Sequence, residues 1–298
     1  MRHFLEVDDL SGDELLHVLS LADEEHPPKV LAGKGMALIW QKPSARTRNS
    51  TEMAVVQLGG HPVSIRNDEI SIGQRETPGD IARTLGCYHA AIGARVFGHS
   101  LLTDMAAAQR VPIVNLLSDD THPMQALADL LTLRREFGRL SGLTIAYIGD
   151  FANVARSLSV GAALVGVHMV ASCPPGFGPS DADIDKVAAL GGSLTTTDRP
   201  ADAVALADCV TTDAWYSMGQ EAQAEARARA FEGFTIDDGL MALAPAHAVF
   251  LHCLPAHRGQ EVTSDVLDGP QSRIWPQAAN RMHAARGLLA FLLGEGFS

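Results

Sequence analysis

The sequence predicts an α/β protein of two domains, each a mostly parallel sheet flanked by helices. Short apolar runs alternate with segments of helical periodicity, a pattern typical of parallel sheets with helices on both faces. A polar stretch at 134–142 precedes a fresh run of strands and marks a domain boundary. With 298 residues, 46% of them hydrophobic, the chain can bury two modest cores. We expect domains at 1–136 and 137–278, with a C-terminal helix at 279–298 that packs back on the first domain.

The first domain begins with a helix signal. Ser11 and Glu14 form a capping-box pattern, and the leucines that follow share one helical face through Leu21. An apolar run at 36–40 predicts a strand, and turn residues lead from it into a helical segment at 46–58. The other elements expected in this domain are strands at 90–94 and 111–117 and a helix at 123–137.

The second domain continues the same alternation. Apolar runs predict further strands at 143–148, 167–171, 209–212 and 248–251. Helical periodicity predicts helices at 154–164, 182–190 and 280–293. Two stretches, 67–80 and 256–261, have the composition of long loops, which in compact domains often carry function.

Charge and cysteine content exclude several classes of protein. The formal net charge of −12 disfavours a general attraction to nucleic acid or to an anionic membrane. The four cysteines have no CxxC or zinc-like spacing, which favours reduced thiols over a disulfide framework. The N-terminal segment carries acidic residues where a signal peptide needs an apolar stretch. We expect a cytoplasmic protein that binds neither nucleic acid nor membrane.

The first candidate site follows the strand at 36–40. Ser44, Arg46 and Thr47 stand where a helix begins, so backbone N–H groups, hydroxyls and a guanidinium can converge on one anion. The alternative is an ordinary serine N-cap followed by surface arginines. The segment has no GxxxxGK[ST] pattern and is not a Walker loop.

Two further candidates lie at the expected ends of strands in the first domain. Arg95 ends an apolar stretch, and a strand-end arginine can point into the crevice where open α/β sheets bind ligands. His122 and Gln125 flank Pro123 at a helix start, where the dipole disfavours protonation of the imidazole. The alternatives are a surface salt bridge for Arg95 and a capping or packed role for His122.

The second domain offers a place for an amino acid. Asn153 follows a strong strand, but no GxGxxG fingerprint accompanies it, so dinucleotide binding is poorly supported and a carboxylate ligand is a better fit. Asp213 lies in an irregular segment at 212–221, where it can face an ammonium group. A charged surface loop around a buried Trp215 remains the alternative.

Cys253 ends the last expected strand, between His252 and His257. A strand-end cysteine can be an activated nucleophile, but most such cysteines are small buried apolar residues, and we do not favour a covalent thiol mechanism. The two histidines and the cysteine fit no usual zinc-ligand spacing. We expect neither a metal nor another cofactor.

Taken together and in order, these motifs resemble the ornithine carbamoyltransferases over essentially the whole chain. The segments that carry the resemblance are 44–48, 122–125, 213–219, 252–255 and 280–283. Within the wider family the Ser-Met-Gly segment and the His-Cys-Leu-Pro run indicate the ornithine branch over the aspartate branch. The resemblance implies transfer of a carbamoyl group from carbamoyl phosphate to L-ornithine in arginine biosynthesis.

The resemblance also assigns roles to residues. It implies a carbamoyl phosphate site at the domain junction, made by Ser44, Ala45, Arg46, Thr47, Arg95, His122, Gln125, Leu254 and Arg281. It implies an ornithine site made by Asn153, Asp213, Ser217 and Met218. It implies that the catalytic residues are Arg95, His122, Cys253 and Arg281, with Cys253 beside the attacking amine.

The family also implies a homotrimer, or a multiple of trimers, with sites at subunit interfaces. Two departures from the family pattern bear on carbamoyl phosphate binding. Ala45 stands where a threonine is usual, and Ser71 stands in the segment 71–76, which in the family reaches a neighbouring subunit's site. Gln74 and Arg75 of this segment therefore need not act as they do in relatives.

Three rival interpretations remain at this stage. A paralogue that carbamoylates another amine, such as putrescine or a different diamino acid, would use the same phosphate site. A non-catalytic homologue would bind small ligands or an active partner, although Arg46, Arg95, His122 and Cys253 are all retained. A Rossmann oxidoreductase is the third, and it lacks the glycine fingerprint.

Overall fold

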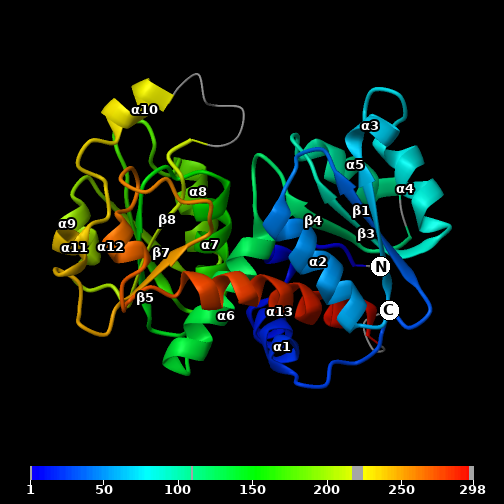
Figure 1. Ribbon diagram of the computed structural model, residues 1–298, viewed down its shortest axis with the longest axis horizontal. Coiled ribbons are helices and arrows are strands. Elements are labelled where there is room, and N and C mark those ends of the chain that lie inside the picture. Colours follow the sequence, from blue (N-terminus) through cyan, green and yellow to red (C-terminus); the bar gives the residue numbers. More distant parts are fainter. Residues whose placement is uncertain (1, 109, 217–223, 295–298) are drawn as a thin grey trace. The chain divides into compact units, whose positions relative to one another are not determined.

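The computed structural model describes residues 2–108, 110–216 and 224–294 (Figure 1). The chain divides into two compact units. Unit 1 comprises Met1–Leu131 and Ala279–Ser298, and unit 2 comprises Thr132–Ala278.

Unit 1 is built on a four-stranded parallel sheet in the order β2-β1-β3-β4. Its strands are β1 (Gly35–Trp40), β2 (His61–Arg66), β3 (His89–Arg95) and β4 (Ile113–Leu117). Its helices are η1 (Val7–Asp9), α1 (Gly12–Asp23), α2 (Ala45–Gln57), α3 (Asn67–Ile70), α4 (Pro78–Gly86), α5 (Ser100–Ala108), most of α6 (Pro123–Phe137) and most of α13 (Ile274–Leu293). The capping box predicted at Ser11 and Glu14 is present at the start of α1.

The sheet of unit 1 is covered on both faces. Ala37 and Ile39 of β1 belong to one apolar cluster with buried residues of α4 and α5. Because side chains alternate along a strand, Met36 and Leu38 face the other way, and both are fully buried. The C-terminal helix packs within this unit, since Arg286 of α13 donates to backbone carbonyls at the end of α1.

Unit 2 is built on a five-stranded parallel sheet in the order β7-β6-β5-β8-β9. Its strands are β5 (Thr144–Ile148), β6 (His168–Ser172), β7 (Ser193–Thr197), β8 (Cys209–Thr212) and β9 (Val249–His252). Its helices are α7 (Asn153–Leu164), α8 (Asp181–Ala189), α9 (Pro200–Val204), α10 (Ala224–Ala230), α11 (Asp238–Met241) and α12 (Ser264–Leu267), together with the C-terminal part of α6 and the start of α13.

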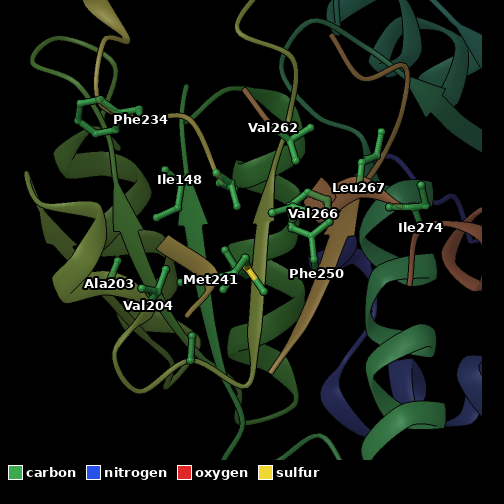
Figure 2. Packing of buried hydrophobic residues seen from close by; sticks show 14 of the residues in the cluster. Ile148, Ala203, Val204, Phe234, Met241, Phe250, Val262, Val266, Leu267 and Ile274 are labelled. Atoms are coloured by element: carbon green, nitrogen blue, oxygen red, sulfur yellow. The ribbon is translucent and has the colours of Figure 1, made fainter. Parts of the chain in front are cut away.

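Two apolar cores lie on opposite faces of this second sheet. Tyr147 of β5 packs with residues of α7 and α8, whereas its neighbour Ile148 packs with residues of α9, α11 and α12. Figure 2 shows the second of these cores, in which Ile148 and Phe250 of the strands lie with Val204 and Met241 of the helices. The predicted fold class, two parallel sheets flanked by helices, is confirmed.

One sequence-based expectation about the loops was wrong. The stretch 67–80 contains the one-turn helix α3 and the start of α4. The Glu69 carboxylate accepts from the Arg66 N–H at 3.2 Å, and the Thr77 hydroxyl accepts from the Asp80 N–H with Pro78 in the first turn. Short helices with strong caps thus form without a long apolar stripe.

Two edge strands carried no clear sequence signal. Strand β2, at one edge of its sheet, has no buried residue, and β7 has one. A strand that is only half covered lacks the continuous apolar run that marks central parallel strands. Within the described residues, no helix is long and apolar enough to cross a membrane.

Candidate active site

The predicted site residues of unit 1 gather at the carboxyl ends of its strands. Ser44 and Thr47 follow β1, Arg95 is the last residue of β3, and His122 follows β4. The chain leaves β1 toward β2 on one side, whereas β3 lies on its other side. This is a topological switch point, the place where open α/β sheets bind ligands.

Helix α2 begins at the switch point. Ser44 is its N-cap, and the serine Oγ accepts from the Thr47 N–H at 3.1 Å. Ala45 is the first helical residue, and Arg46 is exposed on the first turn. The N-terminal N–H groups of a 13-residue helix and its dipole favour an anion here. Ala45 lacks a hydroxyl, but a backbone contact at this position does not need one.

The hydroxyl of Thr47 accepts hydrogen bonds from two guanidinium groups. Arg95 Nη1 donates to Thr47 Oγ1 at 3.3 Å, and Arg281 Nη2 donates to the same oxygen at 3.1 Å. Arg281 also donates through Nη1 to Gln125 Oε1. The exposed fractions of Thr47, Arg95 and Arg281 are 2%, 8% and 5%. Two buried cationic side chains thus converge at the first turn of α2.

Gln125 is oriented by a residue that the sequence analysis missed. Its amide Nε2 donates to Asp129 Oδ1 at 2.7 Å, one turn further along α6. With Nε2 engaged in this way, Oε1 faces Arg281. The i,i+4 spacing of Gln125 and Asp129 on a predicted helix was the available signal.

His122 is neutral in this environment. Burial lowers the pKa of its imidazole well below the ordinary value, and the positive charges of Arg281, Arg95 and Arg46 lower it further. A neutral imidazole can donate one N–H to a carbonyl oxygen without adding a further positive charge.

The arrangement in unit 1 can bind a small phosphorylated compound. Guanidinium groups and a helix N-terminus are the usual ligands of phosphate oxygens. The amide of Gln125 and the imidazole of His122 can bind a neutral polar group such as a carboxamide. Of the residues predicted for this site, Thr47, Arg95, Gln125 and Arg281 are joined by hydrogen bonds, and His122 is coupled to the arginines by charge.

The predicted residues of unit 2 also lie at the carboxyl ends of strands. Asn153 is the first residue of α7, after β5, while Asp213 follows β8 and Cys253 follows β9. Strand β8 lies between β5 and β9, and the order changes direction between β5 and β8. Unit 2 therefore has its own switch point, flanked by Asn153 and Asp213.

Asp213 and Cys253 are in direct contact. The Cys253 thiol donates to Asp213 Oδ1 at 2.9 Å, and the same oxygen accepts from the Ala214 N–H at 2.7 Å. The carboxylate of Asp213 is thereby held in one orientation.

Leu254 follows Cys253 in an unusual backbone conformation. Its φ is +59°, in the left-handed region that few residues other than glycine adopt. The Leu254 N–H donates to His252 Nδ1 at 2.8 Å, so the proton of this ring lies on Nε2, which is 3.2 Å from Glu261 Oε1. The side chains of His252 and Glu261 are both fully buried. A buried pair thus supports the turn that carries the Leu254 carbonyl.

Two predicted residues, Ser217 and Met218, lie outside the described residues. Asn153 is half-buried. Among residues 2–108, 110–216 and 224–294, no group of three or more histidine, cysteine, aspartate or glutamate side chains is placed to hold a metal ion.

Comparison with known proteins gives matches across both units. Residues 2–135 match the family model of the carbamoyl-P binding domain of aspartate/ornithine carbamoyltransferase, and residues 141–292 match that of its Asp/Orn binding domain. An ornithine carbamoyltransferase of Acidothermus cellulolyticus is 47% identical over 302 residues, covering 98% of this chain and 97% of that protein. One from Haloquadratum walsbyi is 43% identical over 300 residues, covering 98% of each.

Solved structures give the same result. The structure of ornithine carbamoyltransferase from Pyrococcus furiosus superposes with a TM-score of 0.94 at 40% sequence identity. The superposition covers 99% of this chain and 98% of that chain.

Proposed function

The chain belongs to the aspartate/ornithine carbamoyltransferase family, and from this premise we propose that it transfers the carbamoyl group of carbamoyl phosphate to the side-chain amine of L-ornithine. The products are citrulline and phosphate. The family resemblance predicted from the sequence is confirmed by both family models and by relatives that match almost the full chain. These relatives favour the ornithine activity over a paralogue acting on putrescine or another diamino acid.

The observation that carries the proposal is the convergence of Arg95 and Arg281 on Thr47 at the start of α2, beside a His122 that is kept neutral. Arg46 and the Ser44-capped helix start would bind the phosphate of the substrate. Arg95, His122 and Thr47 would donate to the carbonyl oxygen.

The reaction needs only these polar groups. The neutral amine attacks the carbonyl carbon, and the carbonyl oxygen gains negative charge that preorganised donors stabilise. The bond from carbon to the bridging phosphate oxygen then breaks, and the departing phosphate takes the proton from the amine. Each donor of this kind contributes on the order of 3 kcal/mol to the barrier reduction. Arg281, through Gln125, would keep the carboxamide end of the substrate in place.

For ornithine, we propose that Asp213 binds the α-ammonium group and that Asn153 binds the α-carboxylate. Ser217 and Met218 complete the proposed ornithine site. Asp213 is held by the Cys253 thiol, so a change at Cys253 would act on the orientation of that carboxylate. The Leu254 carbonyl is proposed to accept from the amide of carbamoyl phosphate.

We further propose that each of the two domains binds one of the substrates. Residues 1–136 with the helix 279–298 form the carbamoyl phosphate-binding domain, and residues 137–278 form the ornithine-binding domain. The spans of the two family models, 2–135 and 141–292, support a division near residue 136. The grouping of Ala279–Ser298 with Met1–Leu131 in one compact unit supports placing the last helix with the first domain. Assembly as a homotrimer or a multiple of trimers, a cytoplasmic location and a role in arginine biosynthesis are proposed on the family resemblance.

The test is an assay of the purified protein with carbamoyl phosphate and a panel of amines. The panel contains L-ornithine, L-lysine, putrescine and L-aspartate, and the ureido product is identified by mass. We expect citrulline from ornithine and little product from the other three. A product from putrescine alone would favour the paralogue, and no ureido product from any amine would favour the non-catalytic homologue.

A further inference from the structure

Arg227 of α10 makes three contacts beyond the carboxyl ends of the strands of unit 2. Its Nη1 donates to Asp150 Oδ2 at 2.6 Å and to the Trp215 carbonyl oxygen at 2.7 Å. Its guanidinium carbon lies 5.1 Å from the ring centroid of Phe177. These three partners follow three different strands, β5, β8 and β6.

Two of these partners are close in sequence to proposed ornithine ligands. Asp150 comes three residues before Asn153, and Trp215 comes two residues after Asp213. Strands β5 and β8 are direct neighbours, and the Thr212 hydroxyl already donates to the Ile148 carbonyl across them. Through Asp150 and Trp215, Arg227 adds a second hydrogen-bonded link between the segments that follow β5 and β8.

The surroundings of Arg227 strengthen these hydrogen bonds. The side chains of Arg227 and Asp150 are only 13% and 21% exposed. Two of the three partners also contact Phe231, which stacks on Trp215 with ring centroids 5.3 Å apart and packs against Phe177 with centroids 4.8 Å apart. A charge-assisted hydrogen bond that is shielded from water is worth more than an exposed ion pair. Arg227 is thus placed to fix the backbone at Trp215 relative to Asp150.

We propose that Arg227 is a positioning residue that sets the spacing between Asn153 and Asp213, and so determines how tightly an amino acid acceptor binds between them. This inference rests on the proposed function. Arg227 contacts protein atoms, and it acts through the segments that follow β5 and β8. An acceptor held at its carboxylate by one residue and at its ammonium by the other is sensitive to that spacing.

Steady-state kinetics separate this role from a purely structural one. The test variant is Arg227→Met, which keeps much of the aliphatic stem over Phe177 but removes the charge and the donors. We expect the KM for ornithine to rise about tenfold or more, while the KM for carbamoyl phosphate changes by less than about twofold. Arg227→Lys, which keeps the charge, should recover part of the lost affinity.

Arg229→Met is the matched control, because Arg229 lies on the same helix and is exposed. We expect it to match the wild type in both KM values. Asp150→Asn should raise the ornithine KM as well, and combining it with Arg227→Met should add little, since the two changes break the same contact.

Other results would overturn the inference. Equal increases in both KM values, or an unchanged KM for ornithine in Arg227→Met, would assign Arg227 to general stability or to no role at the site. A wild type that forms no citrulline would overturn the proposed function together with this inference. An active wild type with an unaffected variant would overturn only the role of Arg227.

Discussion

At the residue scale, the decisive contact is the Thr47 hydroxyl, which accepts from both Arg95 and Arg281. A hydroxyl oxygen has two lone pairs, so Thr47 can accept both donors and still turn its own hydrogen toward a substrate. These hydrogen bonds to a protein atom hold both guanidinium groups in place. Such preorganisation is what makes donors effective on a developing oxyanion.

Arg46→Ala should abolish most of the activity and leave the fold intact. Arg46 is exposed on the first turn of α2, where an arginine adds little to stability, but it is proposed to bind the phosphate. We expect kcat/KM to fall on the order of a hundredfold or more, with an unchanged melting temperature. Arg48→Ala is the control, since Arg48 is also exposed on α2 and pairs with Glu52. Near wild-type rates in Arg46→Ala would refute the phosphate site.

His122 should make the folded state sensitive to acid. Its folded-state pKa lies well below the ordinary value of 6.5, because of burial and the nearby arginines. As the pH falls through about 6.5, the unfolded chain takes up a proton at this residue and the folded chain does not. The free energy of unfolding therefore decreases below that pH, and this loss is absent above it.

The measurement is urea unfolding at about pH 7.5 and at about pH 5.5, for the wild type and for His122→Asn. The variant should lose less stability between the two pH values than the wild type does. Equal losses in the two proteins would mean that His122 is not kept neutral by its surroundings.

At the element scale, helix α2 links the fold to the proposed chemistry through its N-cap, Ser44. Ser44 caps the helix by accepting the Thr47 N–H, and the same turn carries Arg46. A cap holds the helix start, and with it the direction of the N–H groups available to an anion. Loss of the cap should therefore affect both stability and carbamoyl phosphate binding.

Ser44→Ala and Ser180→Ala form a matched pair that tests this link. Both serines are N-caps whose Oγ accepts a backbone N–H, Ser180 at the start of α8. Each change should lower the free energy of unfolding by about 1 kcal/mol. Only Ser44→Ala should also raise the KM for carbamoyl phosphate. If both variants had a similar KM for carbamoyl phosphate, the Ser44 cap would have no role in binding that substrate.

The elements also show what the sequence can and cannot predict. The strand, turn and helix around Ser44 were predictable because each signal is local: an apolar run, a cap and a helical period. The half-buried edge strands β2 and β7 lack such a run and were not predicted. The contact of Arg281 with Thr47 joins residues 234 positions apart, so no spacing rule could give it.

At the scale of the whole molecule, the proposed trimer makes a prediction about mixed subunits. The segment around Arg75 is exposed and, by the family resemblance, completes the site of a neighbouring subunit. If Arg75 keeps this role despite the departure at Ser71, Arg75→Ala should be inactive alone, as should Arg46→Ala. When the two variants are refolded together, sites with both native residues reappear, and about a quarter of the wild-type activity should return.

Arg46→Ala refolded with Arg281→Ala is the control, because both residues belong to unit 1 of the same chain. This mixture should stay inactive. Recovery in the control, or a chain that sediments as a monomer and is fully active, would contradict a site shared between subunits.

Unit 1 is discontinuous in sequence: its two segments, Met1–Leu131 and Ala279–Ser298, enclose all of unit 2. During synthesis from the N-terminus, unit 2 is therefore complete while unit 1 still lacks its last helix. Arg281 is on that helix, so the pair of guanidinium groups at Thr47 can form only after unit 2 has been made. In a ribosome-bound intermediate of this protein, the proposed ornithine site of unit 2 would be complete before the proposed carbamoyl phosphate site of unit 1.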